Sequence, residues 1–402
     1  MAEWGRALPF ETIRGQIAIA GVGETRHSAS SGRDPVEMGL EACAVAIADA
    51  GLKPSDVNGL MTGRGMPGQV TAEIFAKHFG ITHDLWVSDQ GGAMTWAGSA
   101  PYHAARAIHQ KQARVVLNVF SIDWASQRKA ETGGPGDYHK GERFKASFEL
   151  PFGFYPQPVY FAQIARRHMF DYGTTAAQLG AIAVSGRAHA NGHPGAVMHD
   201  KKLTLDDYLA RKPFIEPLRI EDCCLISDGA AAYVMTAVEQ ARDLPHPPAI
   251  VLGVSQSESD WHTYFALQPK LLETPQVFSA PAGYAMAGIT PRDIDVLTIY
   301  DPFTIAALLQ IEDMGFCRKG EGGAFVEGDR LSHRRGRAAG GIPFNTHGGL
   351  LSHAYLLGIS HVVEVVHQLR GTAHNQVKDA KIGVYGGFTG ESSSTLVLGR
   401  AP

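Results

Sequence analysis

The sequence predicts an α/β protein built from two similar halves. Short apolar runs alternate with helical patterns, and the 46 glycines gather at the junctions between them, as α/β proteins require. A thirteen-residue pattern occurs twice, at 48–60 and 285–297, with six identical positions. Each copy is typical of a helix end, a Gly cap, a Pro turn, an Asp cap and a strand. A repeat offset by more than half the chain indicates a duplicated architecture.

The individual elements follow from periodicity and end signals. Residues 17–22 form an apolar run that predicts a buried strand. Residues 35–50 predict a helix, with Pro35 in its first turn and Gly51 after its end. The same criteria predict a helix at 99–110 and strands at 114–120, 228–236 and 249–254.

The pattern weakens between about 121 and 220, which predicts a loop-rich insertion in the first half. Helices are expected there at 162–172 and at about 175–190. Aromatic residues are dense just before them: Phe144, Phe148, Phe152, Phe154, Tyr155, Tyr160 and Phe161. These rings either pack locally or line a site for a large apolar substrate.

Length and composition restrict the class of protein. A chain of 402 residues exceeds one small core, and we expect two domains, 1–243 and 244–402. A net charge of −4 without a basic run predicts no nucleic-acid partner, and no apolar stretch predicts a membrane span. The N-terminal residues lack an apolar signal core, and four Cys in so long a chain fit the reducing cytoplasm.

Two local patterns are interpreted as structural rather than functional. Cys223 and Cys224 have no second ligand pair at zinc-site spacing, so we expect small buried hydrophobes and no metal site in this chain. Gly21 and Gly23 follow the first strand, but the third Gly of a dinucleotide-binding loop is missing.

The most informative segment is Asn345-Thr-His-Gly-Gly-Leu-Leu-Ser-His-Ala-Tyr355-Leu-Leu-Gly-Ile-Ser-His. It has the frame in which thiolases carry N-P-S-G-G-L-x-S-x-G-H-P-x-G-A-T-G, with Tyr355 at the position of the catalytic His. Two further stretches resemble the sterol-carrier-protein-x type of thiolase: 217–232, with Cys-Cys-Leu-Ile-Ser-Asp-Gly-Ala-Ala-Ala at its end, and 297–303, where that group has L-H-D-C-F. The resemblance implies a thiolase fold of two βαβαβαββ halves in a five-layer α/β sandwich.

The departures from that family are equally informative. The alignment puts Met94 where the nucleophilic Cys would be, and Met cannot form an acyl-enzyme. The C-terminal Cys-x-Gly element becomes Val384 or Tyr385 before Gly386 and Gly387, and an Asn-Glu pair becomes Ala306-Ala307. Cys317 matches a structural Cys of the family. Thiolysis by the usual route is therefore not expected.

Two phenols, Tyr300 and Tyr355, replace these groups, a pairing that resembles the thiolase-like steroid side-chain aldolases. The resemblance implies retro-aldol cleavage of a bulky 3-hydroxyacyl-CoA, such as a steroid side-chain CoA thioester. A base takes the hydroxyl proton, the Cα–Cβ bond breaks, a ketone leaves, and the enolate of a short acyl-CoA is protonated. Coenzyme A is then part of the substrate, and no tightly bound cofactor is expected.

Tyr300 and Tyr355 are the candidate acid and base, with the order open. A phenol has a pKa of about 10, so a Tyr base needs a neighbour, for which His347 and His353 are candidates. We expect Asp301 to cap its turn rather than act as a base, and Asp89 is ambiguous. The expected thioester-binding set is Asn345, which orders the loop, with backbone N–H groups of Gly348-Gly349 or Gly386-Gly387 for the enolate oxygen.

Two alternatives remain at this point. One is a thiolase-like acyltransferase without a covalent intermediate, and the other is a non-catalytic subunit that binds acyl-CoA. For partners, the resemblance implies a homodimer that binds a small OB-fold and zinc-ribbon protein to form a heterotetramer.

Overall fold

The two halves of the chain have the same strand order, which confirms the predicted duplication. The computed structural model describes residues 4–63, 68–130, 145–154, 157–260, 269–337 and 339–401. The first half contains β2 (Ile17–Glu24), α1 (Pro35–Asp49), β3 (Gly59–Gly63), α2 (Ala72–Phe79), β4 (Trp86–Gly91), α3 (Thr95–His109), β5 (Val115–Asp123) and β6 (Asp228–Ala237). The second half contains β7 (Ala249–Ser259), α9 (Gln276–Ala287), β8 (Val296–Ile299), α10 (Thr304–Asp313), α13 (Ile359–Arg370), β9 (Ile382–Phe388) and β10 (Ser392–Arg400).

In the first half the strands pair in the order β2-β6-β5-β3-β4, and in the second half in the order β7-β10-β9-β8. In each half the first two pairings are antiparallel and the third is parallel. The two sheets join where β2 meets β7, through Ala18 opposite Ile250 and Ile19 opposite Ala249. A short strand, β1 (Gly5–Ala7), adds to β7.

The second half lacks a full counterpart of β4 among the described residues. In its place a single parallel bridge joins Phe344 to Leu297 of β8. Pro343 has no backbone N–H to donate, and Asn345 has a left-handed backbone with φ 43°, so the pairing stops on both sides. The expected βαβαβαββ order is therefore complete in the first half and reduced at this strand in the second.

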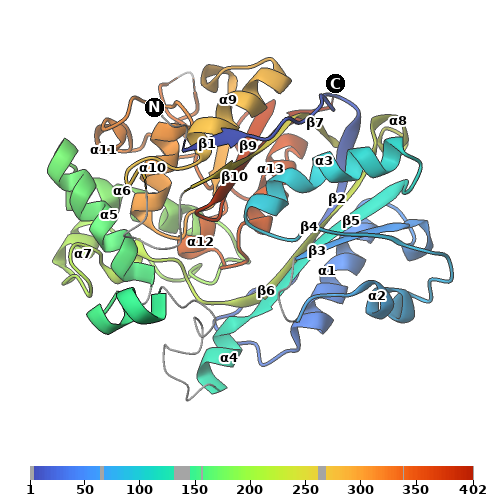
Figure 1. Ribbon diagram of the computed structural model, residues 1–402, viewed down its shortest axis with the longest axis horizontal. Coiled ribbons are helices and arrows are strands. Elements are labelled where there is room, and N and C mark those ends of the chain that lie inside the picture. Colours follow the sequence, from blue (N-terminus) through green and yellow to red (C-terminus); the bar gives the residue numbers. More distant parts are fainter. Residues whose placement is uncertain are drawn as a thin grey trace.

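Five layers result from how the helices cover the sheets (Figure 1). The helices α3 and α13 contact strands of both sheets and form the central layer. The outer face of the first sheet packs against α1 and α2, with Met38 and Phe75 in that core, and α9 packs on β7 and β10. The site described below lies at the N-terminal ends of the two central helices.

The repeated pattern has the same structure in both halves. After α1 comes Gly51 with φ 68°, a short 3₁₀ turn at Pro54–Asp56, and then β3. After α9 comes Gly288 with φ 67°, a short turn at Pro291–Asp293, and then β8. The predicted order of Gly cap, Pro turn, Asp cap and strand is confirmed in both.

The predicted elements are present, with shifted ends. The strand expected at 114–120 continues to Asp123, and the helix expected at 99–110 begins at Thr95. Gly21 and Gly23 serve packing: a Cβ on either would lie 2.3–2.5 Å from the backbone of Ala46 on α1. These two glycines let α1 approach β2 closely, which agrees with the rejection of a dinucleotide loop.

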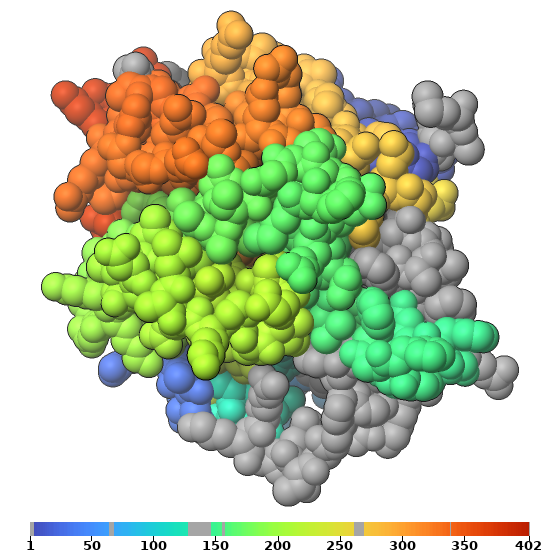
Figure 2. All heavy atoms as spheres, turned by 90° about the vertical axis from the view of Figure 1, so that its left-hand side faces the viewer, coloured from blue at the N-terminus to red at the C-terminus, as the bar shows by residue number. Residues whose placement is uncertain are grey.

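The insertion between β5 and β6 contains α4 (Trp124–Ala130), α5 (Gln157–Tyr172), α6 (Ala176–Asn191) and α7 (Leu205–Ala210). Although it belongs to the first half of the chain, α5 and α6 pack on α10 of the second half, and α6 also packs on α12 (Gly349–Ser352). Figure 2 shows the green atoms of this segment directly below the orange atoms of the second half. The insertion therefore supports the loop that carries Tyr355.

No helix within the described ranges is both long and apolar enough to span a bilayer. For the domain division we propose the boundary 243/244, because it falls in the connection between α8 (Val238–Ala241) and β7.

Candidate active site

The structure brings the two predicted phenols together. Tyr300 directly follows β8, and Tyr355 lies between α12 and α13. Their hydroxyl oxygens are 3.5 Å apart, at the outer limit of a hydrogen bond. Tyr300 is 6% exposed and Tyr355 is 8% exposed, so both rings are buried while their hydroxyls face one another. Either hydroxyl can therefore be the donor to the other.

Each phenol is fixed through its backbone. The N–H of Tyr300 donates to Gly386 of β9 at 2.8 Å, and its carbonyl accepts from Gln310 of α10, also at 2.8 Å. The N–H of Tyr355 donates to the Ser227 hydroxyl at 2.7 Å, just before β6. The Tyr355 ring lies 5.4 Å from the Trp124 ring at the start of α4. The site is thus assembled from both halves of the chain and the insertion.

Asn345 orders the loop, as the sequence predicts. Its side-chain carbonyl accepts from the N–H of Ile299 at 2.9 Å, and its side-chain amide donates to the Ile299 carbonyl at 3.1 Å. Asn345 is fully buried. These two bonds take the place of sheet pairing and fix the loop to the residue that precedes Tyr300.

A buried hydrogen bond joins Asp301, the residue after Tyr300, to His361, and sequence reasoning did not single out His361. The Asp301 carboxylate accepts from the His361 Nε2 at 3.1 Å and from the N–H of Leu350, in the first turn of α12, at 2.8 Å. Asp301 therefore orders its surroundings, as predicted. The only sequence signal for His361 was its position in the same segment as Tyr355.

His347 and His353 lie in a cluster of imidazoles. Their ring centroids are 4.9 Å apart, and His347 lies 4.6 Å from the ring of His361. Neither has a hydrogen-bond partner within the part of the chain that the structure describes. Burial, together with the neighbouring histidines, lowers the pKa of both well below the usual value, so both are neutral at physiological pH. His361, next to His347 in this cluster, is hydrogen-bonded to Asp301, the residue after Tyr300.

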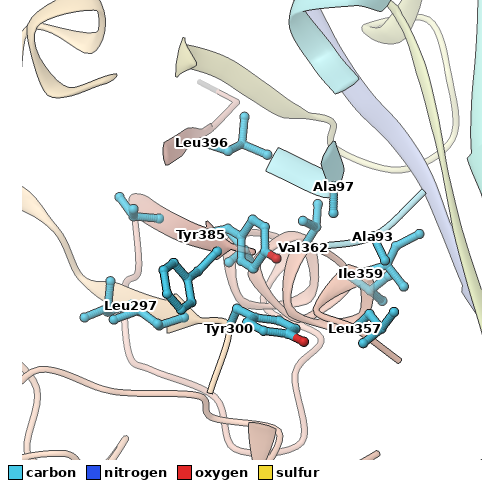
Figure 3. Close-up of a cluster of buried hydrophobic side chains, with 14 of the residues drawn as sticks. Ala93, Ala97, Leu297, Tyr300, Leu357, Ile359, Val362, Tyr385 and Leu396 are labelled. Atoms are coloured by element: carbon cyan, nitrogen blue, oxygen red, sulfur yellow. The ribbon is translucent and has the colours of Figure 1, made fainter. Parts of the chain in front are cut away.

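A third tyrosine, Tyr385, lies at the former Cys-x-Gly element, which the sequence places at Val384 or Tyr385. The Tyr385 hydroxyl donates to the Met94 carbonyl at 2.9 Å, and a Cβ on Gly358 would lie 2.4 Å from that hydroxyl. Burial, with smaller contributions from Tyr300 and others, raises the pKa of Tyr385 well above its ordinary value, so this phenol stays protonated. Figure 3 shows the Tyr385 and Tyr300 rings side by side near Leu357.

Met94 has the backbone of a strained functional position. It is the N-cap of α3 with φ 53° and ψ −131°, and its N–H donates to the Leu357 carbonyl at 2.6 Å. Such conformations cost about 1–3 kcal/mol and persist only where the surroundings enforce them. The sequence alignment puts Met94 at the nucleophile position, and a Met side chain cannot attack a thioester.

The cysteines supply no nucleophile. All four are free, and burial is the main cause that raises the pKa of the Cys223 and Cys317 thiols to about 12. Burial likewise raises the pKa of the Cys43 and Cys224 thiols. A thiol that stays protonated is a poor nucleophile.

The four glycines of the predicted thioester-binding set lie at close approaches. Gly349 has φ 63°, and a Cβ there would lie 2.2 Å from the Asp301 carboxylate. Gly387 lies so close to Met94 that a Cβ would be 2.7 Å from its carbonyl oxygen. Gly348 has φ 116°, and Gly386 accepts the N–H of Tyr300. Gly386 thus adjoins Tyr300 and Gly349 adjoins Asp301, and the contact of the four glycines with a thioester remains a prediction.

Some aromatic residues of the insertion border the site. Phe161 of α5 stacks on Phe303, which is three residues after Tyr300 in the sequence, and the two ring centroids are 4.2 Å apart. Phe148 and Phe152 are exposed, whereas Tyr160 is buried beside Phe154. Phe144 and Tyr155 lie outside the described residues.

Glu364 on α13 gives a pH prediction. Burial raises its pKa to about 7, although hydrogen bonds from Thr346 and Gln368 favour the charged form. The pKa of Glu364 in the folded protein is higher than its pKa of about 4.3 in the unfolded chain. Its contribution to the free energy of unfolding is therefore fully present below about pH 4.3 and is lost as the pH rises through about 7.

We therefore expect Glu364→Gln, which mimics the neutral acid, to remove this dependence. Relative to the variant, the wild type should lose about 2–3 kcal/mol of unfolding free energy between about pH 5 and about pH 8. Urea unfolding of both proteins across this range measures the difference, and parallel curves would contradict the assignment.

Comparisons with known proteins agree with the geometry. A family model described as "Thiolase C-terminal domain-like" matches residues 257–400, which include both phenols. A steroid side-chain-cleaving aldolase of Thermomonospora curvata is 36% identical, with 97% of this chain and 99% of that protein covered. A 17-hydroxy-3-oxo-4-pregnene-20-carboxyl-CoA lyase of Mycobacterium tuberculosis is 34% identical, with 96% and 100% covered. The solved structure of an Ltp2-ChsH2(DUF35) aldolase superposes with a TM-score of 0.86 at 34% identity, covering 97% of this chain and 99% of that one.

Proposed function

The chain belongs to the thiolase superfamily, in the branch that contains the steroid side-chain-cleaving aldolases, and from this premise we propose that it is a lyase acting on a bulky 3-hydroxyacyl-CoA. The observation that carries the proposal is the pair of hydroxyls 3.5 Å apart, Tyr300 and Tyr355, beside a Met at the nucleophile position. Full-length relatives whose names describe this cleavage support it.

The reaction needs no external reactant. One tyrosine of the pair, in its phenolate form, accepts the proton of the substrate 3-hydroxyl, and the electrons of the O–H bond form the ketone carbonyl as the Cα–Cβ bond breaks. The electron pair of that bond passes to the thioester enolate. The other phenol then protonates the α-carbon, and transfer between the two hydroxyls restores the starting state. One proton moves from oxygen to carbon, and the products are a ketone and a short acyl-CoA.

The enolate oxygen needs hydrogen-bond donors. We assign this role to the backbone N–H groups of Gly348-Gly349 or Gly386-Gly387; Gly386 adjoins Tyr300, and the Gly348 N–H donates to the Asn345 carbonyl in the free protein. One such donor contributes about 3 kcal/mol. His347 and His353, both neutral, complete the proposed catalytic set as neighbours of His361, whose Nε2 donates to Asp301.

Partner and location are part of the same proposal. The aligned Ltp2-ChsH2(DUF35) aldolase carries a second protein in its name, which supports a small partner protein for this chain, and we propose that a homodimer binds it to form a heterotetramer. The four free cysteines fit a reducing compartment, and we place the protein in the cytoplasm. Size measurement of the chain, alone and with a candidate partner, tests the assembly.

The direct test is incubation, with and without the partner, with 17-hydroxy-3-oxo-4-pregnene-20-carboxyl-CoA, the compound in the name of one relative. We expect release of a 17-ketosteroid and a short acyl-CoA. Binding of the thioester without C–C cleavage would contradict the lyase proposal. Acyl transfer to added free CoA would favour an acyltransferase instead.

The intact mass of the protein during turnover provides an independent prediction. Because Met94 occupies the nucleophile position and burial raises the thiol pKa values, we expect no mass increase from a bound acyl group at any time after mixing. A thiolase that forms an acyl-enzyme is the positive control. A stable acyl adduct on this chain would refute the non-covalent mechanism.

A further inference from the structure

Three side chains beside the catalytic loop form a set of metal-ligand type. Glu24 ends β2, His27 lies in the loop that follows, and His353 follows α12 in the second half. One ligand atom from each lies within 4.8 Å of the others, and the Glu24 carboxylate is 3.8 Å from the His27 Nε2. Carboxylate oxygen and imidazole nitrogen together are a ligand set that Zn²⁺ uses in proteins.

The bonding capacity of this group is unused within the described ranges. Both ring nitrogens of His353 lack a hydrogen-bond partner, as do the His27 Nδ1 and one oxygen of Glu24. His353 is 1% exposed and His27 is buried. Leaving buried polar atoms unpaired is costly, and such atoms usually have a partner in the working protein. A cation bound by this group would satisfy one nitrogen of His353 and the unpaired oxygen of Glu24, with His27 contributing its Nε2.

The surroundings leave room for a further ligand. A cavity of about 150 Å³ adjoins Glu24 and is also lined by His193, His347, Ser360 and Glu364. The His193 ring lies 4.7 Å from the His353 ring. A water molecule needs about 30 Å³, so the cavity can supply a water ligand.

Gly229 of β6 provides space for one of the ligands. A Cβ at this position would lie 2.6 Å from the His27 Nδ1, so any larger residue would displace the ring. Only with glycine there can the opposite nitrogen, Nε2, face Glu24.

We propose that Glu24, His27 and His353 bind one divalent cation of the Zn²⁺ class, with the fourth position open to the cavity. Zinc–nitrogen bonds of about 2.0–2.1 Å place tetrahedral ligands about 3.3 Å apart, so the side chains close in by rotation on binding. The ion ties the end of β2 to the loop two residues before Tyr355. It is a positioning ion that links the two halves at the catalytic loop.

This site departs from the sequence-based expectation that the chain holds no metal. Positions 24, 27 and 353 form no ligand-spacing motif, and only the fold brings them together. The proposal does not depend on the reaction, because metal binding is measured without substrate.

The test uses the full chain without a histidine tag, freed of metal by a chelator and titrated with Zn²⁺ against a chromophoric competitor. We expect about one equivalent per chain, and Co²⁺ in its place should give visible absorption of a tetrahedral or five-coordinate ion. Glu24→Gln and His27→Gln should each weaken binding by about 10²-fold or more while far-UV circular dichroism is unchanged.

His103→Gln is the matched control, because the His103 Nε2 is likewise buried without a partner among the described residues but lies on α3 outside the cluster. It should bind metal like the wild type. As a second readout, Zn²⁺ should raise the unfolding temperature of the wild type and of His103→Gln but not of Glu24→Gln. Wild-type protein that binds no Zn²⁺, or Glu24→Gln and His27→Gln variants that bind as tightly as the wild type, would overturn the proposal.

Discussion

Replacing Tyr355 by Phe is expected to lower kcat for C–C cleavage by about 10²–10⁴-fold, the usual contribution of a positioned acid or base. The variant keeps the ring that lies beside Trp124 and the backbone bond to Ser227, and it loses only the hydroxyl 3.5 Å from Tyr300. The thioester should therefore bind with little change. Single-turnover assays of ketone release, with a separate measurement of acyl-CoA binding, distinguish the two steps.

The double variant with Tyr300→Phe strengthens this test. If the two hydroxyls pass one proton between substrate oxygen and carbon, removing the second should cost much less than removing the first. Tyr284→Phe is the matched control, because this buried phenol donates to the Met314 carbonyl in the outer helical layer. It should keep the wild-type kcat. Activity that survives Tyr355→Phe would make both phenols structural and favour a non-catalytic acyl-CoA-binding role.

The sequence predicts the duplicated fold because the repeated signals are local. The Gly cap, Pro turn and Asp cap at 48–60 and 285–297 act within a few residues, and each determines its own turn in the structure. The strand at Phe344 is reduced by equally local features, Pro343 and the left-handed Asn345. Their effect is recognised only if a strand that pairs with β8 is expected at this point. A prediction based on the sequence repeat alone therefore misses the reduced strand in the second half.

The site divides in the same way between local and distant effects. Tyr355, Tyr300 and Asn345 are identified from short segments with a family frame, and the structure brings them together. The histidine cluster depends on contacts between segments far apart in sequence. The ring centroid of His353 lies 4.7 Å from that of His27 and 4.7 Å from that of His193. No periodicity or spacing encodes such contacts, because they arise from the packing of β2, α6 and the catalytic loop.

The prediction with the largest expected effect on stability concerns Asn345. Its amide satisfies the buried N–H and C=O of Ile299, and no other residue type offers both groups at that reach. Asn345→Gly removes both hydrogen bonds, and glycine adopts the φ of 43° without strain. The decrease in unfolding free energy of this variant therefore measures the two hydrogen bonds alone. At about 1–3 kcal/mol for each of the two unpaired buried groups, we expect a loss of about 2–6 kcal/mol.

Asn345→Ala adds the cost of a left-handed backbone, about 1 kcal/mol more than the glycine variant. Asp379→Ala measures that backbone cost alone, because Asp379 is exposed and has φ 54°. Urea unfolding of the three variants should therefore give the order Asn345→Ala, Asn345→Gly, Asp379→Ala from least to most stable. If Asn345→Gly were no less stable than Asp379→Ala, the two bonds to Ile299 would not be what holds the catalytic loop beside Tyr300.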